Sequence, residues 1–111
     1  MTDELRLEGI GVAPGVLETI VTLAAEGVDG VEKVETTGLG GLVHKTGKAL
    51  AVTVDESGNM AVEVHVTLRY GQPLHEVARN VQKSVAEALT SQTGQQVTRV
   101  AVFVDAITFQ Q

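Results

Sequence analysis

The sequence predicts an α+β fold, a two-layer sandwich in which two helices pack on one face of a mixed β-sheet. Three observations predict it. Residues 60–70 alternate apolar and mainly polar side chains, and a period of two gives a strand one buried and one exposed face. After a break at Gly71-Gln72-Pro73, apolar residues recur at helical spacing, and a valine-rich stretch beginning at Val97 follows. Because a strand–helix–strand connection within one sheet is right-handed, we expect the last strand to run parallel to residues 60–70.

The first half of the chain predicts a helix and a short strand. Residues 5–12 mix apolar side chains with glycine and are expected to form at most a short edge strand or an extended lead-in. From Pro14 onward apolar residues recur at spacings of three and four, and Gly27 suits a helix end, so we expect a helix of about fourteen residues. Residues 28–37 indicate a short strand with a bulge or a late start. Residues 38–47 contain four glycines and predict a flexible loop.

The second half predicts a hairpin, a long helix and a final strand. Residues 50–55 alternate in character, and the polar turn at residues 56–59 joins them to the long strand as an antiparallel hairpin. Pro73 fits the first turn of the second helix, and Gly94 is expected in the left-handed conformation after its end. The final strand, residues 97–109, should place alternate side chains on opposite faces. One face carries Val100, Val102, Val104 and Ala106, and the other carries Arg99, Ala101, Phe103, Asp105, Ile107 and Phe109.

Length, composition and charge narrow the class of protein. At 111 residues the chain is expected to form a single domain, residues 1–111, around one core. Hydrophobic residues make up 43% and aromatic residues only 3%, so the core must be aliphatic. The chain has no cysteine, which excludes disulfides, thiolate metal sites and thiol nucleophiles. The net charge of −6 disfavours nucleic-acid partners. With no signal-like or membrane-spanning segment, we expect a cytoplasmic protein without direct membrane insertion.

Several stretches together resemble one known family. They are residues 68–78 with their Tyr-Gly pair, the Val-Gln-x-x-Val segment at residues 81–85, the Thr93-Gly94 pair, and residues 97–104, in which Val100, Val102 and Val104 alternate with other side chains. In this order and spacing they resemble the alkaline shock protein family of Gram-positive bacteria, and the likeness covers most of the chain. The sequence departs from the family in the short segment of residues 38–48 and at Ala13, where a capping Ser or Thr is common.

The resemblance implies a function as well as a fold. It implies a non-enzymatic cytoplasmic scaffold or assembly protein, without cofactor, that is linked to the cell-envelope stress response or homeostasis. Members of the family tend to form homo-oligomers, and some are recruited to the inner membrane face by a small membrane-anchoring protein. These properties are what the resemblance implies, and neither periodicity nor charge shows them.

The outer face of the predicted sheet is the candidate interaction surface. Small and apolar side chains on that face would make it flat and partly hydrophobic, and such faces often bind another protein. The alternative, scattered apolar residues that simply contact water, has equal weight at this point. No catalytic, cofactor-binding or metal residues are predicted. The predicted protein-interaction face comprises Phe103, Ile107, Ala101, Ala51, His65 and Arg69.

Two glycine-rich segments suggest alternatives. Residues 9–15 precede a helix, where a phosphate could bind, but Pro14 stands in place of the third glycine of the dinucleotide pattern and a P-loop lysine is missing,. Gly38-Leu39-Gly40-Gly41 matches the Gly-x-x-Gly loop of KH domains, so a small KH-like module that binds single-stranded RNA is the alternative function. We favour a flexible connector, because the segment would join strands rather than helices.

Metal binding and catalysis are disfavoured. His44, His65 and His75 do not have the close spacing of a ligand set, and they are expected on a loop, on an exposed strand face and in a first helical turn. Glu63, His65 and Arg69 would share the exposed face of the long strand. Since an open sheet surface does not exclude water, we expect no catalysis there.

Overall fold

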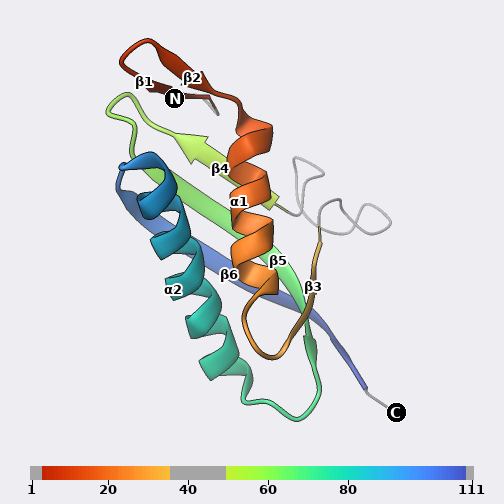
Figure 1. Cartoon of the computed structure of the whole chain (residues 1–111). Coiled ribbons are helices and arrows are strands. Elements are labelled where there is room, and N and C mark those ends of the chain that lie inside the picture. Colours follow the sequence, from red (N-terminus) through yellow and green to blue (C-terminus); the bar gives the residue numbers. More distant parts are fainter. Residues whose placement is uncertain (1–3, 36–49, 110–111) are drawn as a thin grey trace.

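The computed structural model describes residues 4–35 and 50–109. Within them, two helices lie side by side on one face of a twisted main sheet, and a small hairpin lies at one end (Figure 1). The predicted α+β fold is therefore confirmed. In chain order the elements are β1 (Leu5–Leu7), β2 (Ile10–Val12), α1 (Pro14–Glu26), β3 (Val31–Val34), β4 (Leu50–Val54), β5 (Met60–Arg69), α2 (Leu74–Thr93) and β6 (Val97–Thr108).

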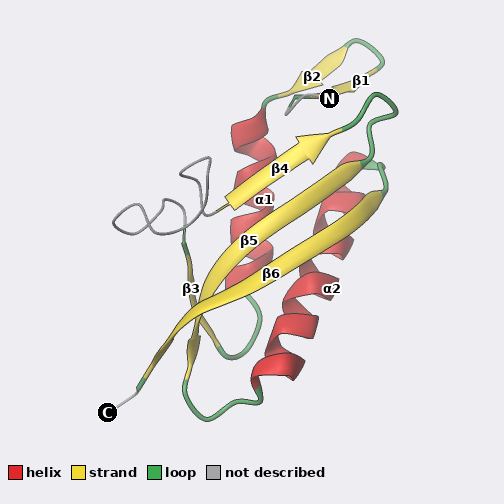
Figure 2. Cartoon of the chain, turned by 180° about the vertical axis from the view of Figure 1, so that it is seen from behind, coloured by secondary structure: helices red, strands yellow, loops and turns green. Residues whose placement is uncertain are grey.

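Strand β5 is the centre of the main sheet. Strands β4 and β3 pair with it antiparallel, one after the other along its length. Strand β6 pairs with it in parallel from Met60 to Arg69, as the crossover rule predicts. The helices cover one side of this sheet, and we call the other side, seen in Figure 2, the open face. The sheet is mixed, and both helices lie on the same side, as predicted from the sequence.

The core lies between the helices and the sheet. Helix α1 begins at Pro14, whose fixed φ suits a first turn,, and α2 is followed by Gly94 with φ 75°, the left-handed cap that was predicted. Each buried Val or Leu side chain contributes about 1.5–3 kcal/mol by leaving water. The helices contribute Leu17, Val21, Ala25, Val77, Val81, Val85 and Leu89, and β5 contributes Val62, Val64, Val66 and Leu68.

Residues 5–12 form a hairpin, and the expectation of at most one edge strand or an extended lead-in is wrong. Strands β1 and β2 pair antiparallel from Leu5↔Val12 to Leu7↔Ile10. Glu8 and Gly9 both have positive φ, 39° and 85°, which is the requirement of a tight two-residue hairpin turn. The buried Leu5 anchors this hairpin to the core.

Irregularities in the pairing decide which face a side chain occupies. The register of β3 against β5 shifts between Val31 and Lys33, which confirms the predicted bulge. Strand β6 skips Asp105, so that Ala106 lies opposite Thr67 and Ile107 opposite Leu68. Since directly paired residues share a face, Ile107 lies on the helix side and Ala106 on the open face. The sequence prediction of their faces is therefore wrong, because strict alternation takes no account of a bulge. The predicted loop of residues 38–47 lies outside the described residues.

Candidate protein-interaction face

The open face is lined by side chains from β3, β4, β5 and β6, and within the described residues no helix covers it (Figure 2). Strand β5 supplies the central row, while β4 and β6 supply the rows beside it. Of the six residues predicted for the interaction face, five lie here and Ile107 does not. The face carries Lys33, Ala51, Thr53, Ala61, Glu63, His65, Thr67, Arg69, Arg99, Ala101, Phe103, Asp105, Ala106 and Thr108.

His65 lies at the middle of the open face and is only 6% exposed. Its Nδ1 is 2.9 Å from Asp105 Oδ2 and its Nε2 is 3.3 Å from Glu63 Oε2. The Phe103 ring stacks on the imidazole at 4.7 Å with an angle of 16° between the planes. The expectation that His65 is exposed is therefore wrong. Its cover comes from Phe103 and Asp105 of β6 and from Glu63 of its own strand, on a face without a described helix.

Phe103 is the large apolar side chain that this arrangement presents to the outside. It remains 43% exposed, and its inner side is supported by the imidazole of His65. Ala51 and Ala101 are half-buried, and their side chains are single methyl groups, much shorter than the Phe103 ring. A supported aromatic ring beside small residues has the form of a contact point for another protein.

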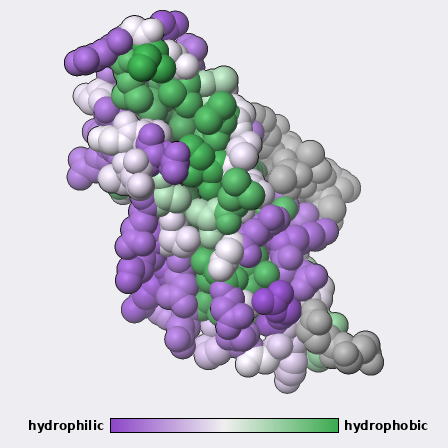
Figure 3. Space-filling view, in the orientation of Figure 1, coloured by the Kyte–Doolittle hydropathy of each residue, from purple (hydrophilic) through white to green (hydrophobic). Residues whose placement is uncertain are grey.

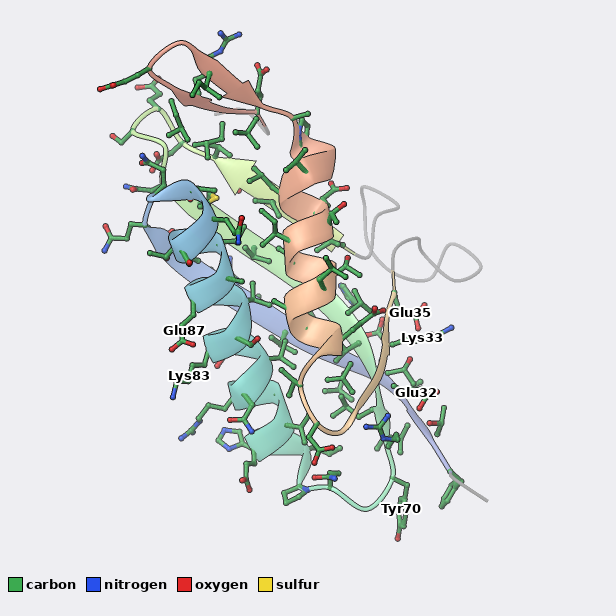
Figure 4. All side chains as sticks on the ribbon, viewed as in Figure 1. Glu32, Lys33, Glu35, Tyr70, Lys83 and Glu87 are labelled. Carbon is green, nitrogen blue, oxygen red and sulfur yellow. The ribbon has the colours of Figure 1, made fainter. Side chains whose placement is uncertain are left out.

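The end of the open face near β3 is fixed by polar contacts. The hydroxyl of Thr67 donates to Glu35 Oε2 at 2.9 Å, and both residues are buried, 2% and 5% exposed. Lys33 Nζ lies 3.7 Å from the same carboxylate oxygen. Glu32, Lys33 and Glu35 extend from the β3 segment in Figure 4. Sequence reasoning missed Glu35, because a glutamate at a strand end normally lies in water. The one sequence feature that could have indicated a role for Glu35 is Lys33, a possible ion-pair partner two residues earlier.

Arg69 is tied to the sheet rather than free for a partner. Its Nη1 donates to the Val31 carbonyl oxygen at 3.3 Å and lies 3.5 Å from Glu32 Oε1, while Nη2 lies 3.8 Å from Asp29 Oδ1. These contacts join the end of β5 to β3 and to the turn before it. The predicted role of Arg69 in an interaction face remains a prediction, and the contacts favour a structural role.

The charged groups of the open face do not form a metal site. Glu63 and Asp105 contact opposite nitrogens of the His65 ring, so the three groups do not converge on one point. Among the described residues no group of three His, Asp or Glu side chains could hold a metal ion. His75 lies on α2, across the sheet, with its Nε2 3.4 Å from Arg79 Nη2, and His44 lies outside the described residues.

Of the two glycine-rich segments, the structure describes the first and not the second. Gly9 lies in the turn of the β1–β2 hairpin and Gly11 lies within β2. These glycines therefore form part of a hairpin instead of a loop in front of α1, which removes the basis for a phosphate site. The segment Gly38-Leu39-Gly40-Gly41 lies outside the described residues, so the KH-like alternative remains a hypothesis.

The helix side also exposes apolar residues. Figure 3 shows a hydrophobic band over α1 and the β1–β2 hairpin, and the exposed side chains there are Ile10, Val16 and Leu23. A groove of about 450 Å³ lies between the start of α2 and Ile107 and is flanked by Tyr70. A second groove, of about 360 Å³, runs between α2 and β6 and contains Arg79, Lys83 and Arg99.

Two proteins of similar sequence and one solved structure of similar fold are found among known proteins. The uncharacterized protein Spy1535 of Streptococcus pyogenes serotype M6 is 28% identical over 100 residues, which cover 88% of this chain and 78% of that protein. The uncharacterized protein YqhY of Bacillus subtilis strain 168 is 26% identical over 111 residues, which cover 96% and 82%. The solved structure of a MamM CTD is similar with a TM-score of 0.52 at 15% identity, covering 83% of this chain and 96% of the other. At that identity the likeness shows the fold alone.

In the part of the chain that the structure describes, neither helix is both long and apolar enough to cross a bilayer.

The family follows from a model that matches nearly the whole chain. The model of the alkaline shock protein 23 family, which is described by a cell envelope-related function, matches residues 3–109. The chain belongs to that family, and the resemblance noted from residues 68–104 is confirmed.

Proposed function

We propose that this chain is a non-enzymatic scaffold of the cell envelope that associates with copies of itself through the open face. A small membrane-anchored partner would recruit it from the cytoplasm to the inner membrane face. The family description, a cell envelope-related function, supports the setting. The recruitment step follows the properties of the family that the sequence resembles.

One observation carries the proposal: Phe103 is 43% exposed on a face that no described helix covers. An aromatic side chain has about 150–250 Å² of surface, so roughly 90 Å² of this ring contacts water. Covering that area on association would contribute about 2 kcal/mol per protomer. Because His65 already supports the ring, little side-chain freedom is lost on binding.

The contacts of His65 support a role without catalysis. Both nitrogens of the ring contact carboxylates, and these contacts together with the Phe103 stack hold the ring in one orientation. A general acid or base acts from a site that excludes water and presents a reactive group to substrate. The open face is instead one side of a sheet that no described helix covers, which suits a protein surface better than an enclosed substrate site.

The test is a substitution at Phe103 with light scattering as the measurement. Phe103→Glu places a charge at the proposed contact and should lower the mean mass toward that of one chain. The matched control is Gln92→Glu, which adds the same charge at an exposed position of α2 and should leave the mass unchanged. Leu23→Glu tests the apolar band on α1. If Leu23→Glu disperses the protein and Phe103→Glu does not, the open face is the wrong surface.

Recruitment has a separate test. A pull-down from native membranes with the unmodified protein should recover a small membrane-spanning partner. The Phe103→Glu protein shows whether the partner requires the same face. Recovery of no membrane protein would contradict the recruitment step and leave self-association to stand by itself.

A further inference from the structure

The outer edge of β6 is an unguarded sheet edge. Strand β6 runs for 12 residues and, among the described strands, pairs only with β5. The outer edges of β4 and β3 are shorter, at 5 and 4 residues. Exposed edges are often protected by charged side chains, proline or bulges. Strand β6 contains no lysine or proline, and its two register shifts, at residues 98 and 105, lie outside the regular run of residues 99–104. A long unguarded edge is a template for strand pairing.

We propose that β6 pairs antiparallel with β6 of a second copy, around a two-fold axis at Val102. This inference rests on the proposed self-association and adds a second contact to it, at the edge of the sheet beside Phe103. The two main sheets would join into one continuous sheet, with the helices of both copies on the same side.

The backbone register shows which groups point away from β5. Residues 62, 64 and 66 of β5 pair with residues 100, 102 and 104 of β6. The Glu35 N–H donates to the His65 carbonyl oxygen at 2.9 Å, so the backbone of residue 65 faces β3, and the alternate residues 62, 64 and 66 face β6. In a parallel ladder their N–H and C=O groups bond to the residues on either side of their partners. The backbone groups of residues 100, 102 and 104 therefore point to the free edge. Gln82 Nε2 donates to the Val100 carbonyl oxygen at 3.0 Å, which agrees with this direction. A carbonyl oxygen has two lone pairs, so it can also accept from a second strand.

The side chains favour one register. Centring the pair on Val102 places Arg99 opposite Asp105 of the second copy, and Ala101 opposite Phe103 of the second copy. Opposite charges then meet twice, and a large ring lies beside a methyl group, with all four side chains on the open face. The carboxylate of Asp105 contacts His65 and retains capacity for a further donor.

The neighbouring registers lack these matches. Centring on Ala101 places Arg99 opposite Phe103 and leaves Asp105 opposite Val97. Centring on Phe103 sets the two phenyl rings directly opposite each other and places Ala101 opposite Asp105. Charge and size complementarity therefore select the Val102 axis.

Burial gives an independent reason for pairing at this edge. Val62, Val64 and Val66 of β5 are buried, whereas their neighbours Val100 and Val102 on the same side of the sheet are only partly buried. The difference arises because β6 has a strand on one side only. A second β6 strand would cover this remaining apolar surface. The shifts in register at residues 98 and 105 border the regular run, so the proposed ladder has about six hydrogen bonds.

Cysteine trapping tests the register directly, because the natural chain has no cysteine. In the proposed pair Val102 lies opposite its own copy, with Cα atoms about 5.5 Å apart, within disulfide range. Val102→Cys should therefore form a covalent dimer under mild oxidation. Val100→Cys and Val104→Cys each lie about 13 Å from their own copy. Neither should link alone, but their equimolar mixture should yield a dimer containing one chain of each.

Charge reversal tests the pair across the edge. Arg99→Glu should weaken association by roughly tenfold, since two attractive pairs become repulsive. The double variant Arg99→Glu/Asp105→Arg should restore it. Arg6→Glu is the control, with the same change in charge at an exposed position of β1, and it should have no effect.

The outcomes separate the two proposals. If the natural protein scatters light as a single chain, the proposed self-association is wrong and the edge pairing falls with it. If it associates but Val102→Cys does not link and Arg99→Glu has no effect, the edge pairing alone is wrong. Efficient linking by Val100→Cys alone would also overturn the Val102 register. Linking at Val102 together with rescue by the double variant would confirm it.

Discussion

The buried contact between Thr67 and Glu35 offers a sharp test of how the open face is held. Thr67→Val replaces the hydroxyl that donates to Glu35 Oε2 at 2.9 Å with a methyl group of similar size. The Glu35 carboxylate is 5% exposed and would lose this donor without gaining water. Hydrogen bonds to charged groups contribute about 1.5–3 kcal/mol, so we expect a loss of about 2 kcal/mol in unfolding free energy.

The loss is large enough to measure by thermal unfolding. With about 2.1 cal/mol/K of unfolding entropy per residue, 2 kcal/mol corresponds to a decrease in Tm of roughly 8 °C for a chain of this length. Thr53→Val is the matched control, because Thr53 lies on the same face and its hydroxyl makes only a long contact of 3.5 Å to the Ala61 carbonyl oxygen. That variant should stay within about 0.5 kcal/mol of the natural protein.

A double variant decides whether the loss of a donor to the buried Glu35 carboxylate is the cause. Thr67→Val/Glu35→Leu removes both partners, and the replacement of both by apolar groups is often nearly neutral. It should recover most of the lost Tm. If Thr67→Val behaves like Thr53→Val, or if the double variant is no more stable than Thr67→Val, the reasoning about this contact is refuted.

Three further predictions concern the core, a turn and association. Leu89→Ala, at a fully buried position of α2, should lower the free energy of unfolding measured in urea by about 2–5 kcal/mol. Leu23→Ala, at an exposed position, should lower it by less than about 0.5 kcal/mol. Equal losses would contradict the burial of Leu89 in the core. Gly94→Ala should lower stability by about 1 kcal/mol, because φ is 75° there,. Gly15→Ala in α1, where an added Cβ meets nothing within 4 Å, should be neutral or stabilising in the same thermal assay. Self-association measured by light scattering should strengthen as salt rises from about 0.01 to 0.15 M, because salt screens the repulsion between copies that each have a net charge of −6,. Weaker association at the higher salt concentration would contradict this.

Periodicity predicted the main elements because each has one side against the core. The alternation of residues 60–70 and the stripe of α2 both report burial on one side, and the parallel course of β6 follows from the handedness of the crossover. The sequence does not predict the β1–β2 hairpin, because strands of three residues are too short to show an alternation of apolar and polar side chains. Its turn depends on the φ values of Glu8 and Gly9, which composition does not reveal.

The candidate site was predicted less well, for two physical reasons. His65 occupies a polar position in the alternation, yet it is buried, because Phe103 covers its ring and Asp105 and Glu63 bind its nitrogens. The alternation of polar and apolar residues predicts on which side of the sheet a side chain lies. It does not predict whether neighbouring side chains bury it. Ile107 was assigned to the wrong face because one extra residue, Asp105, inverts the alternation after it,.

The net charge of −6 bears on whether copies of this chain can associate at all. Two copies side by side would have centres about 28 Å apart, the middle dimension of the molecule. Their charges would repel by about 5 kcal/mol in water without salt. Screening lowers this to about 2 kcal/mol at 0.01 M and to roughly 0.1 kcal/mol at 0.15 M.

The proposed contact between Arg99 and Asp105 acts over a few ångströms and is screened much less than the repulsion between whole molecules. Salt therefore removes the long-range repulsion first, and self-association should strengthen over this range. Binding of single-stranded RNA would have the opposite dependence, because salt weakens the attraction between basic groups and phosphates. Light scattering of the protein alone therefore tests self-association, and filter binding of single-stranded RNA, which salt should weaken, tests the KH-like alternative.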